Sequence, residues 1–262
     1  MIRSLLKHRY LIAQMTLREV LQRYRGSMLG IVWSFVLPLI MLAVYMFVFS
    51  VVFKTRWGLE QESEIQFGVI LFSGLIVHAL FTECLTRAPG LITGNVQLVK
   101  KVVFPLEILP LVTLCSALFH FAVSLLVLVI FMVVAGFTIP LTAFLAPLVL
   151  APLVLLILGM NWFLASLGVY VRDIAQMVGV VATILLFMSP IFFPISRIPE
   201  QWQVFIYMNP ITTIVIELRK VLMWGELPNW YHLGIYTLVG LFSLVCGYWW
   251  FSRTRRGFAD VI

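Results

Sequence analysis

The sequence has few charged residues and almost no aspartate. Only 11% of its 262 residues are charged, whereas soluble domains carry roughly 25%, and Asp173 and Asp260 are the only aspartates. Hydrophobic residues make up 62% of the chain. A chain this apolar cannot bury its side chains in one water-soluble core, so lipid must solvate much of it. No stretch is polar enough for a separate soluble domain, and we predict one all-α integral membrane domain over residues 1–262.

Several catalytic motifs are missing as well. The sequence contains no Gly-Lys dipeptide, so it has no Walker A loop and no ATPase of its own. It contains neither an HExxH nor a GxSxG motif. Its one carboxylate cluster, Glu60, Glu62 and Glu64, follows the first apolar run and is interpreted as a solvated outer loop. We therefore expect no enzyme, and no metal or cofactor in this chain.

Cysteine is scarce and basic residues outnumber acidic ones. Cys84, Cys115 and Cys246 lie in apolar runs without CxxC spacing, so we expect neither a disulfide nor a metal site. A net charge of +7 would suggest nucleic acid in a soluble protein. In a membrane protein it usually marks the cytoplasmic ends of spans, so no nucleic-acid partner is expected. The first apolar run begins near Ile31 and is too long for the core of a signal peptide.

Six apolar runs are long enough to cross a bilayer, which takes roughly 20 residues. They cover residues 31–53, 65–85, 108–135, 141–169, 174–193 and 233–251. The first three runs do not resemble the last three, which argues against an inverted repeat. The sequence therefore predicts six transmembrane helices.

Residues 194–230 are rich in proline, and charged residues such as Arg219 interrupt their apolar positions. That pattern is typical of amphipathic helices and not of a span. We expect two short helices, about 199–208 and 211–224, folded as a re-entrant pair at the outer face around Asn209-Pro210.

Basic residues set the orientation. With the N-terminus in the cytoplasm, 13 of the 18 Lys and Arg residues lie inside and five outside, as the positive-inside rule requires. The inside residues are Arg3, Lys7, Arg9, Arg18, Arg23, Arg25, Arg87, Lys100, Lys101, Arg172, Arg253, Arg255 and Arg256. The outside residues are Lys54, Arg56, Arg197, Arg219 and Lys220. We expect both termini in the cytoplasm.

Residues 1–30 form the predicted cytoplasmic interface segment. Apolar residues from Leu17 to Tyr24 recur at helical spacing, with basic residues on the other face. A capping box at Thr16 and Glu19 predicts that this helix begins at Thr16. We expect it to lie in the membrane interface with its basic side toward lipid headgroups.

Ion-coupled transporters usually bury ionisable residues in the middle of their spans. Polar groups within these spans are few: His78, Glu83, His120 and Asn161. Glu83 and Arg87 are spaced for a helical ion pair, and the histidines are interpreted as packing residues rather than proton relays. Ion-coupled transport and a multipass membrane enzyme are therefore the weaker alternatives.

Five motifs follow one another along nearly the whole chain. They are Gln22–Ser34 (QRYRGSMLGIVWS), Asn95–Pro110 (NVQLVKKVVFPLEILP), Tyr170-Val171-Arg172-Asp173, Ser189–Pro194 (SPIFFP) and Met208-Asn209-Pro210. As an ordered set they resemble the permeases of polysaccharide ABC exporters, which are type-2 export permeases. The resemblance is strongest to the O-antigen exporters.

This resemblance implies a homodimeric permease in the bacterial inner membrane, bound to two copies of a separate ATP-binding cassette subunit that carries ATP and magnesium. It implies an export channel at the dimer interface, lined partly by the first and fifth spans. It also implies a coupling helix after the second span and short gate helices after the fifth. The implied cargo is an undecaprenyl-linked polysaccharide of the O-antigen type, with capsular polysaccharide and teichoic acid as alternatives.

Aromatic residues recur every four positions toward the outer end of the first span, and others lie at the matching depth of the fifth. A flat ring can support the apolar C–H face of a sugar without fixing it by directional bonds. The predicted channel lining is Tyr45, Phe49, Phe53, Phe187 and Phe192. Packing against lipid is the competing interpretation of these rings.

The polar loop after the second span is expected to press a short helix, about Pro89–Leu98, into the ATP-binding subunit. The predicted coupling residues are Pro89, Asn95, Leu98, Lys100 and Lys101, helped by Arg172 and Asp173. The predicted gate hinges are Pro190, Asn209 and Pro210. A residue before proline leaves the helical region, and the Asn209 side chain can cap the helix that follows.

Overall fold

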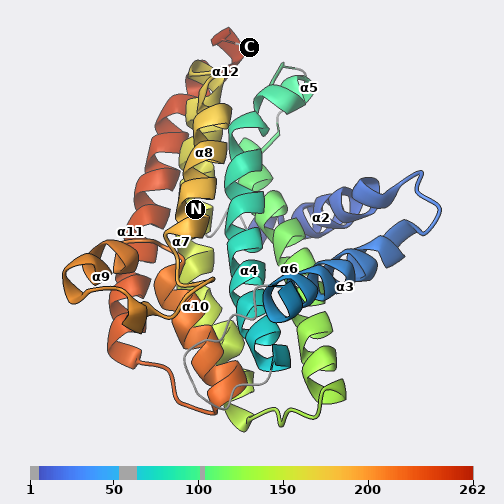
Figure 1. Ribbon diagram of the computed structural model, residues 1–262. Coiled ribbons are helices and arrows are strands. Elements are labelled where there is room, and N and C mark those ends of the chain that lie inside the picture. The colour runs from blue at the N-terminus through green and yellow to red at the C-terminus, as the bar shows by residue number, and fades with distance from the viewer. Residues whose placement is uncertain (1–5, 53–63, 101–103, 262) are drawn as a thin grey trace.

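The structure is a computed structural model that describes residues 6–52, 64–100 and 104–261. Every regular element in these ranges is helical, and they contain no strand (Figure 1). The α-helices are α2 (Arg9–Tyr24), α3 (Trp33–Met46), α4 (Glu64–Arg87), α5 (Val96–Lys100), α6 (Leu109–Val134), α7 (Ala146–Tyr170), α8 (Ile174–Phe187), α9 (Glu200–Tyr207), α10 (Thr212–Arg219), α11 (Trp230–Thr254) and α12 (Phe258–Val261).

Helices α4, α6, α7 and α11 run alongside one another and form the packed centre of the molecule (Figure 1). The closest approach is between α7 and α11, where a Cβ added to Gly247 would lie 2.0 Å from the backbone oxygen of Gly159. Small residues let two helix backbones meet in a membrane, where lipid is as apolar as leucine and van der Waals packing drives association. Leu128, Leu153 and Trp162 are fully buried between these helices. The centre of one chain is thus a filled apolar core.

Five helical stretches are long and apolar enough to cross a membrane. They are Gly30–Phe49, Ile65–Gly90, Leu106–Val134, Leu141–Tyr170 and Trp230–Val261. Each overlaps one of the predicted spans, in the predicted order. The last extends beyond its predicted bounds of 233–251 at both ends.

The span predicted at 174–193 extends six residues beyond the end of its helix, α8 (Ile174–Phe187). Its helix, α8, has 14 residues and is about 21 Å long at 1.5 Å per residue, whereas the hydrocarbon core measures about 30 Å. The helix ends at Phe187 and the chain turns at Ser189, because the residue before Pro190 is pushed out of the helical region. The apolar run continues to Phe193 and hides this boundary from hydropathy.

Helices α2 and α3 form an arm that projects from the bundle (Figure 1). Helix α2 begins at Arg9, so the start predicted at Thr16 from the capping box is wrong. Ile12 packs with Ile108 and Val112 in a small apolar cluster at the base of α6. This tertiary contact extends the helix a full two turns before the box.

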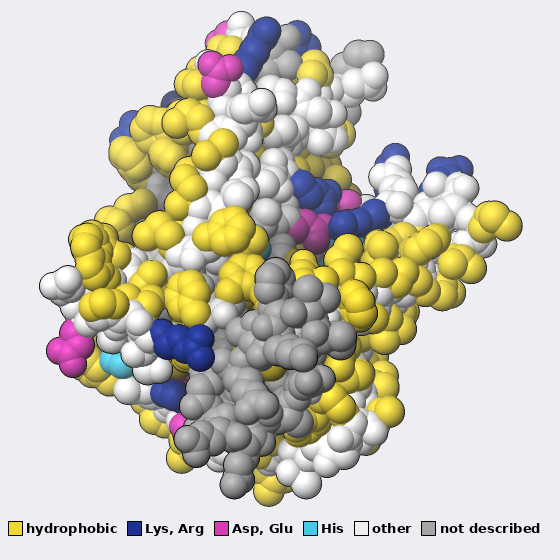
Figure 2. Space-filling model, viewed as in Figure 1, with side chains coloured by type: hydrophobic (Ala, Val, Ile, Leu, Met, Phe, Trp, Pro, Cys, Tyr) yellow, Lys and Arg dark blue, Asp and Glu magenta, His cyan; other side chains and the backbone are white. Residues whose placement is uncertain are grey.

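Helix α3 contains Pro38 and passes at Phe47 into a π-helix that runs to Val52. Only 11% of its apolar window is buried. Phe35, Leu39 and Val44 are among its exposed residues, and the arm presents a broad hydrophobic surface (Figure 2). One face of the first span is therefore exposed and can contact lipid or another protein surface.

The segment predicted as two short helices contains α9 and α10, the second of which continues as a π-helix from Lys220 to Trp224. The chain turns between them at Asn209-Pro210. Helix α10 packs against α4 and α7. It is thus inserted into the bundle instead of lying on its surface.

One end of the bundle brings α5 and the C-terminal helix α12 together (Figure 1). Arg255, just after α11, pairs at 3.0 Å with Glu107, which precedes α6. The ends of three separate helices thus meet there. Lys100 and Arg253, both predicted to lie inside, are exposed residues of α5 and α11.

Candidate functional site

Three predicted channel residues meet in one aromatic cluster, made by Phe49, Phe187 and Phe192. The Phe192 ring stacks on Phe49 with 5.8 Å between centroids and on Phe187 with 5.9 Å. Phe49 also lies 6.1 Å from Phe67 of α4. Phe187 keeps 65% of its surface exposed. The cluster therefore joins the first span to the end of α8 and leaves one ring available for further contact.

Tyr45 lies apart from that cluster. It lines a cavity of about 400 Å³ between α3, α4 and α6, together with Phe72 and Leu186. The π-helix that begins at Phe47 changes the angular spacing after Tyr45, so the four-residue repeat does not keep the rings on one face. Phe53, the third member of that repeat, lies outside the described residues.

One proline turn precedes the short helices and a second lies between them. At the first, Ser189–Ile191 (the proline turn), the backbone N–H of Ile191 donates to the Ser189 carbonyl at 2.7 Å. The kink predicted at Pro190 is a helix end, not a bend within a helix. At the second turn, Asn209 is buried and its Nδ2 donates to the Leu185 carbonyl of α8 at 2.8 Å.

Asn209 does not cap α10 as predicted. Its Oδ1 accepts from the backbone N–H of Ile211 at 3.0 Å, which is the two-residue reach of an Asx turn. The helix begins only at Thr212, and its N-cap residue has no side-chain bond. Pro210 contributes its carbonyl, which accepts a hydrogen bond from the Tyr236 hydroxyl of α11. The second turn is therefore tied to α8 and to α11.

Arg219, the last residue of α10, is buried to 1% exposure. Its Nη1 donates to the Pro190 carbonyl at 2.6 Å, and its Nη2 donates to the Ile70 carbonyl at 2.9 Å and the Ile191 carbonyl at 3.3 Å. Its Nε reaches Ile70 at 3.1 Å and the Ser73 hydroxyl at 3.3 Å. Burial lowers the pKa of Arg219 to about 9, so the side chain stays charged at neutral pH.

The sequence analysis placed Arg219 among the outside basic residues of an amphipathic helix and did not predict that it is buried. The signal was present in the helical spacing. Ile211, Val215, Arg219 and Leu222 fall on one face, and the three apolar members are buried. An arginine on an apolar face is a buried arginine with partners, because burying an unpaired charge costs a great deal.

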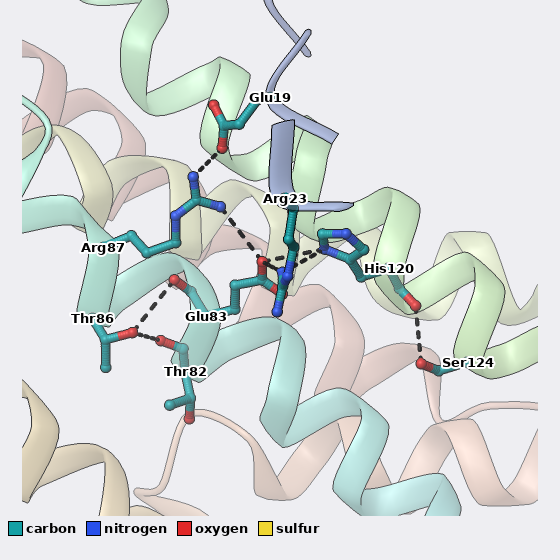
Figure 3. A network of polar contacts seen from close by, with 8 residues as sticks. All are labelled: Glu19, Arg23, Thr82, Glu83, Thr86, Arg87, His120 and Ser124. Atoms are coloured by element: carbon teal, nitrogen blue, oxygen red, sulfur yellow. Dashed lines mark hydrogen bonds and ion pairs between the residues drawn. The ribbon is translucent and has the colours of Figure 1, made fainter. Parts of the chain in front are cut away.

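A second group of polar residues joins the arm to the bundle (Figure 3). This charged cluster consists of Glu19 and Arg23 from α2, Glu83 and Arg87 from α4, and His120 from α6. Arg23 pairs with Glu83, and Arg87 pairs with Glu19. Glu83 lies 3.5 Å from Arg87, the predicted helical pair, and 3.2 Å from His120 Nδ1. On each of α2 and α4 a glutamate precedes an arginine by four residues. Each glutamate can therefore pair with the arginine of the other helix.

The charged cluster is partly screened from solvent. The Glu83 and His120 side chains are 18% and 14% exposed, while Arg23 is 49% exposed. It lies beside an open cavity of about 810 Å³ that Arg23, His78 and Thr82 line, and charged side chains gather in the crevice between arm and bundle (Figure 2). Arg23, on the basic face of α2 that is predicted to point toward headgroups, pairs with Glu83 and keeps 49% of its side chain exposed.

The predicted coupling residues occupy a folded loop after α4. In place of one helix over Pro89–Leu98, it has 3-10 turns at Ala88–Gly90 and Thr93–Asn95 followed by α5. Asn95 Nδ2 donates to the Leu91 carbonyl at 2.9 Å, and Leu98 packs on the core.

Pro89 is buried under α7, where a Cβ on Gly168 would lie 2.2 Å from the Pro89 oxygen. It can anchor the loop but presents little surface to a partner. Lys100 is exposed, and Lys101 lies outside the described residues.

Arg172 and Asp173 lie at the start of α8 and are exposed. They line an open surface cavity of about 600 Å³ with Gln176 and Val180. The 3-10 turn Ala88–Gly90 packs against α8 as well as α7. The loop after α4 and the start of α8 are thus mechanically connected.

Within the part of the chain that the structure describes, no group of three or more His, Cys, Asp or Glu side chains could hold a metal ion. Two groups of side chains are held together by specific contacts. They are the aromatic cluster, with Arg219 beside it, and the charged cluster.

Comparison with known proteins finds relatives that match nearly the whole chain. The chain is 27% identical to an O-antigen export system permease protein RfbA of Klebsiella pneumoniae, covering 96% of this chain and 95% of the relative. It is 25% identical to RfbA of Myxococcus xanthus, covering 100% and 99%. It is 28% identical to the polysialic acid transport protein KpsM of Escherichia coli, covering 92% and 91%. Residues 10–223 match the family model described as ABC-2 type transporter. The chain belongs to the ABC-2 type transporter family.

Proposed function

We propose that this chain is the membrane-spanning subunit of an ATP-driven exporter that moves a lipid-linked polysaccharide of the O-antigen type from the cytoplasm across the bacterial inner membrane. One observation carries the proposal. Relatives named for O-antigen export match it over 95% or more of both lengths, so the likeness includes the arm, the spans and the outer short helices together.

Capsular polysaccharide is the second candidate cargo. The polysialic acid transport protein is as similar in identity, at 28% over 246 residues. Coverage and the motif that leads into the first span favour O-antigen. Loss of the protein distinguishes the two, because only one class of surface glycan would disappear.

The geometry supports a path between two copies of the chain. A polysaccharide is polar, and stripping its hydroxyls of water costs several kcal/mol each, so it needs a wide, continuous path through about 30 Å of hydrocarbon. The centre of one chain is filled. Helices α3 and α8 instead present exposed apolar faces, with Phe187 at the end of α8. Two copies that join along these faces would bring their aromatic clusters to a shared path.

We propose six spans with both termini in the cytoplasm. Helix α8 would then reach the outer side through the proline turn, with α9 and α10 as periplasmic gate helices. The grouping of α5, α12 and the Arg255–Glu107 pair at one end supports a basic cytoplasmic end. Helix α2 would lie near that interface, held by the charged cluster.

ATP hydrolysis would take place on two copies of a separate ATP-binding subunit. The proposed contact includes Lys100 of α5 and, just before α8, Arg172 and Asp173, all exposed. Because the Ala88–Gly90 turn packs on α8, a push on this loop would reach the helix that ends at the aromatic cluster.

Depletion of the protein tests the function. With the gene repressed, surface O-antigen should disappear while the lipid-linked glycan accumulates in the cytoplasmic leaflet. Continued appearance of surface glycan in fully depleted cells would overturn the proposal.

The coupling contact has its own test. Lys100→Glu and Arg172→Glu should reduce glycan export and ATPase stimulation in the assembled complex, because each reverses a charge on the proposed contact. Arg256→Glu, a reversal at the same end but outside the proposed contact, is the matched control. Equal effects of all three variants would refute the assignment.

A further inference from the structure

Arg219 connects three parts of the chain that are far apart in sequence. It ends α10, it donates to Ile70 and Ser73 of α4, and it donates to the two carbonyls of Pro190 and Ile191 in the proline turn. Helix α4 belongs to the packed centre. The proline turn, by contrast, is a short connection without a helix of its own.

The residue directly after this turn is Phe192, the central ring of the aromatic cluster. Its stacking on both Phe49 and Phe187 depends on where the turn directs it. With its carbonyls fixed by one guanidinium, the turn has a defined position relative to α4. The aromatic cluster is therefore positioned by a buried cation rather than by helix packing alone.

The guanidinium of Arg219 is closely packed against Gly74 of α4. A Cβ added to Gly74 would lie 2.8 Å from Arg219 Nη2 and 3.0 Å from Ile191 Cγ1. Only glycine at this position leaves room for both the cation and the turn. Arginine suits the role because its planar fork donates several hydrogen bonds in fixed directions, which a lysine ammonium on a flexible stem cannot reproduce.

We propose that Arg219 is the positioning residue of the outer gate, a lock that holds the proline turn and Phe192 in the closed arrangement. The inference rests on the proposed export function. Opening the gate would require the turn to leave Arg219, while α10 and α4 stay joined through Ile70 and Ser73. Weakening the lock should therefore let the resting pore open without loss of the folded chain.

Two variants weaken the lock by different changes. Arg219→Lys keeps the charge but loses the fork, and Gly74→Ala keeps the arginine but displaces its Nη2. Each loses charge-assisted bonds to the turn, so each should raise the resting ion leak by roughly tenfold or more. Arg197→Met, an exposed arginine of the same outer segment, and Gly179→Ala, with open space at its Cβ, are the matched controls.

The measurement uses the complete complex with its ATP-binding subunit in liposomes. Leak of chloride is followed without nucleotide by an entrapped chloride-sensitive dye, and glycan export per ATP hydrolysed is measured in parallel. A purely structural role would lower complex abundance and leave both quantities per complex unchanged. Raised leak and reduced export per ATP in intact complexes would support the lock.

Unchanged leak and coupling in both variants, with the wild type exporting glycan, would overturn the lock alone. If Arg219→Lys fails to assemble, Gly74→Ala decides, because its arginine remains. If the wild-type complex shows no ATP-dependent glycan export at all, the proposed function fails, and the lock fails with it.

Discussion

Glu83 should stabilise the arm mainly through Arg23 and only slightly through Arg87. Glu83 is the shared partner of Arg23, Arg87 and His120, and its side chain is 18% exposed. Glu83→Gln keeps the shape and removes the charge, which leaves Arg23 without its acidic partner, while Arg87 still pairs with Glu19.

The size of each term follows from burial and geometry. A fully buried pair loses about 3–5 kcal/mol when one partner is removed, but Arg23 is 49% exposed, so solvent screening reduces its coupling to Glu83 to about 1 kcal/mol. The Arg87 pair is an i,i+4 contact at 3.5 Å and should contribute only about 0.3–0.5 kcal/mol.

A double-mutant cycle measures both terms. Thermal unfolding of the full-length chain in detergent, followed by tryptophan fluorescence, is compared for Glu83→Gln, Arg23→Gln, Arg87→Gln and the two double variants. A loss of about 1 kcal/mol corresponds to roughly 2–4 °C in Tm for a chain of this size. The Arg23 double variant should melt no lower than Glu83→Gln alone. Additive losses for Glu83 and Arg23, or a larger coupling to Arg87, would refute the reasoning.

Three further predictions follow from the fold and the aromatic cluster. Phe49→Leu and Phe192→Leu should each slow glycan export without lowering complex abundance, because leucine suits lipid but offers no flat face to a sugar ring; normal export in both would support packing against lipid instead. Gly247→Leu should destabilise the chain by several kcal/mol, as an added Cβ alone would lie 2.0 Å from the backbone of α7; an unchanged melting temperature would contradict the close approach. A cysteine at Gln201 should react with a membrane-impermeant reagent applied from the periplasm, and reaction only from the cytoplasm would overturn the six-span topology.

Hydropathy and charge were enough to predict an all-helical chain with its long spans in order. The end of α8 was not predicted, because the apolar run continues past Pro190 and hydropathy does not register that a proline restricts the residue before it. Helix α2 begins at Arg9 and not at its capping box, since the contact of Ile12 with α6 outweighs the local signal.

The candidate site shows the same division between local and tertiary information. The i,i+4 pair of Glu83 and Arg87 was visible in the sequence, whereas the pairs with Arg23 and Glu19 require α2 to lie against α4. The buried state of Arg219 was legible from its helix face, but its partners in the proline turn come from the fold. The one face predicted for Tyr45 and Phe49 is interrupted by the π-helix at Phe47.

Reconstitution tests the central claim most directly. The purified chain and its ATP-binding subunit are placed in liposomes that carry the lipid-linked O-antigen in one leaflet, and access of the glycan to an impermeant glycosidase is followed after ATP is added. The account predicts ATP-dependent transfer of the glycan to the opposite leaflet, and none with either subunit alone. Failure of the intact complex to move the glycan while it hydrolyses ATP, or equal transfer without ATP, would contradict it.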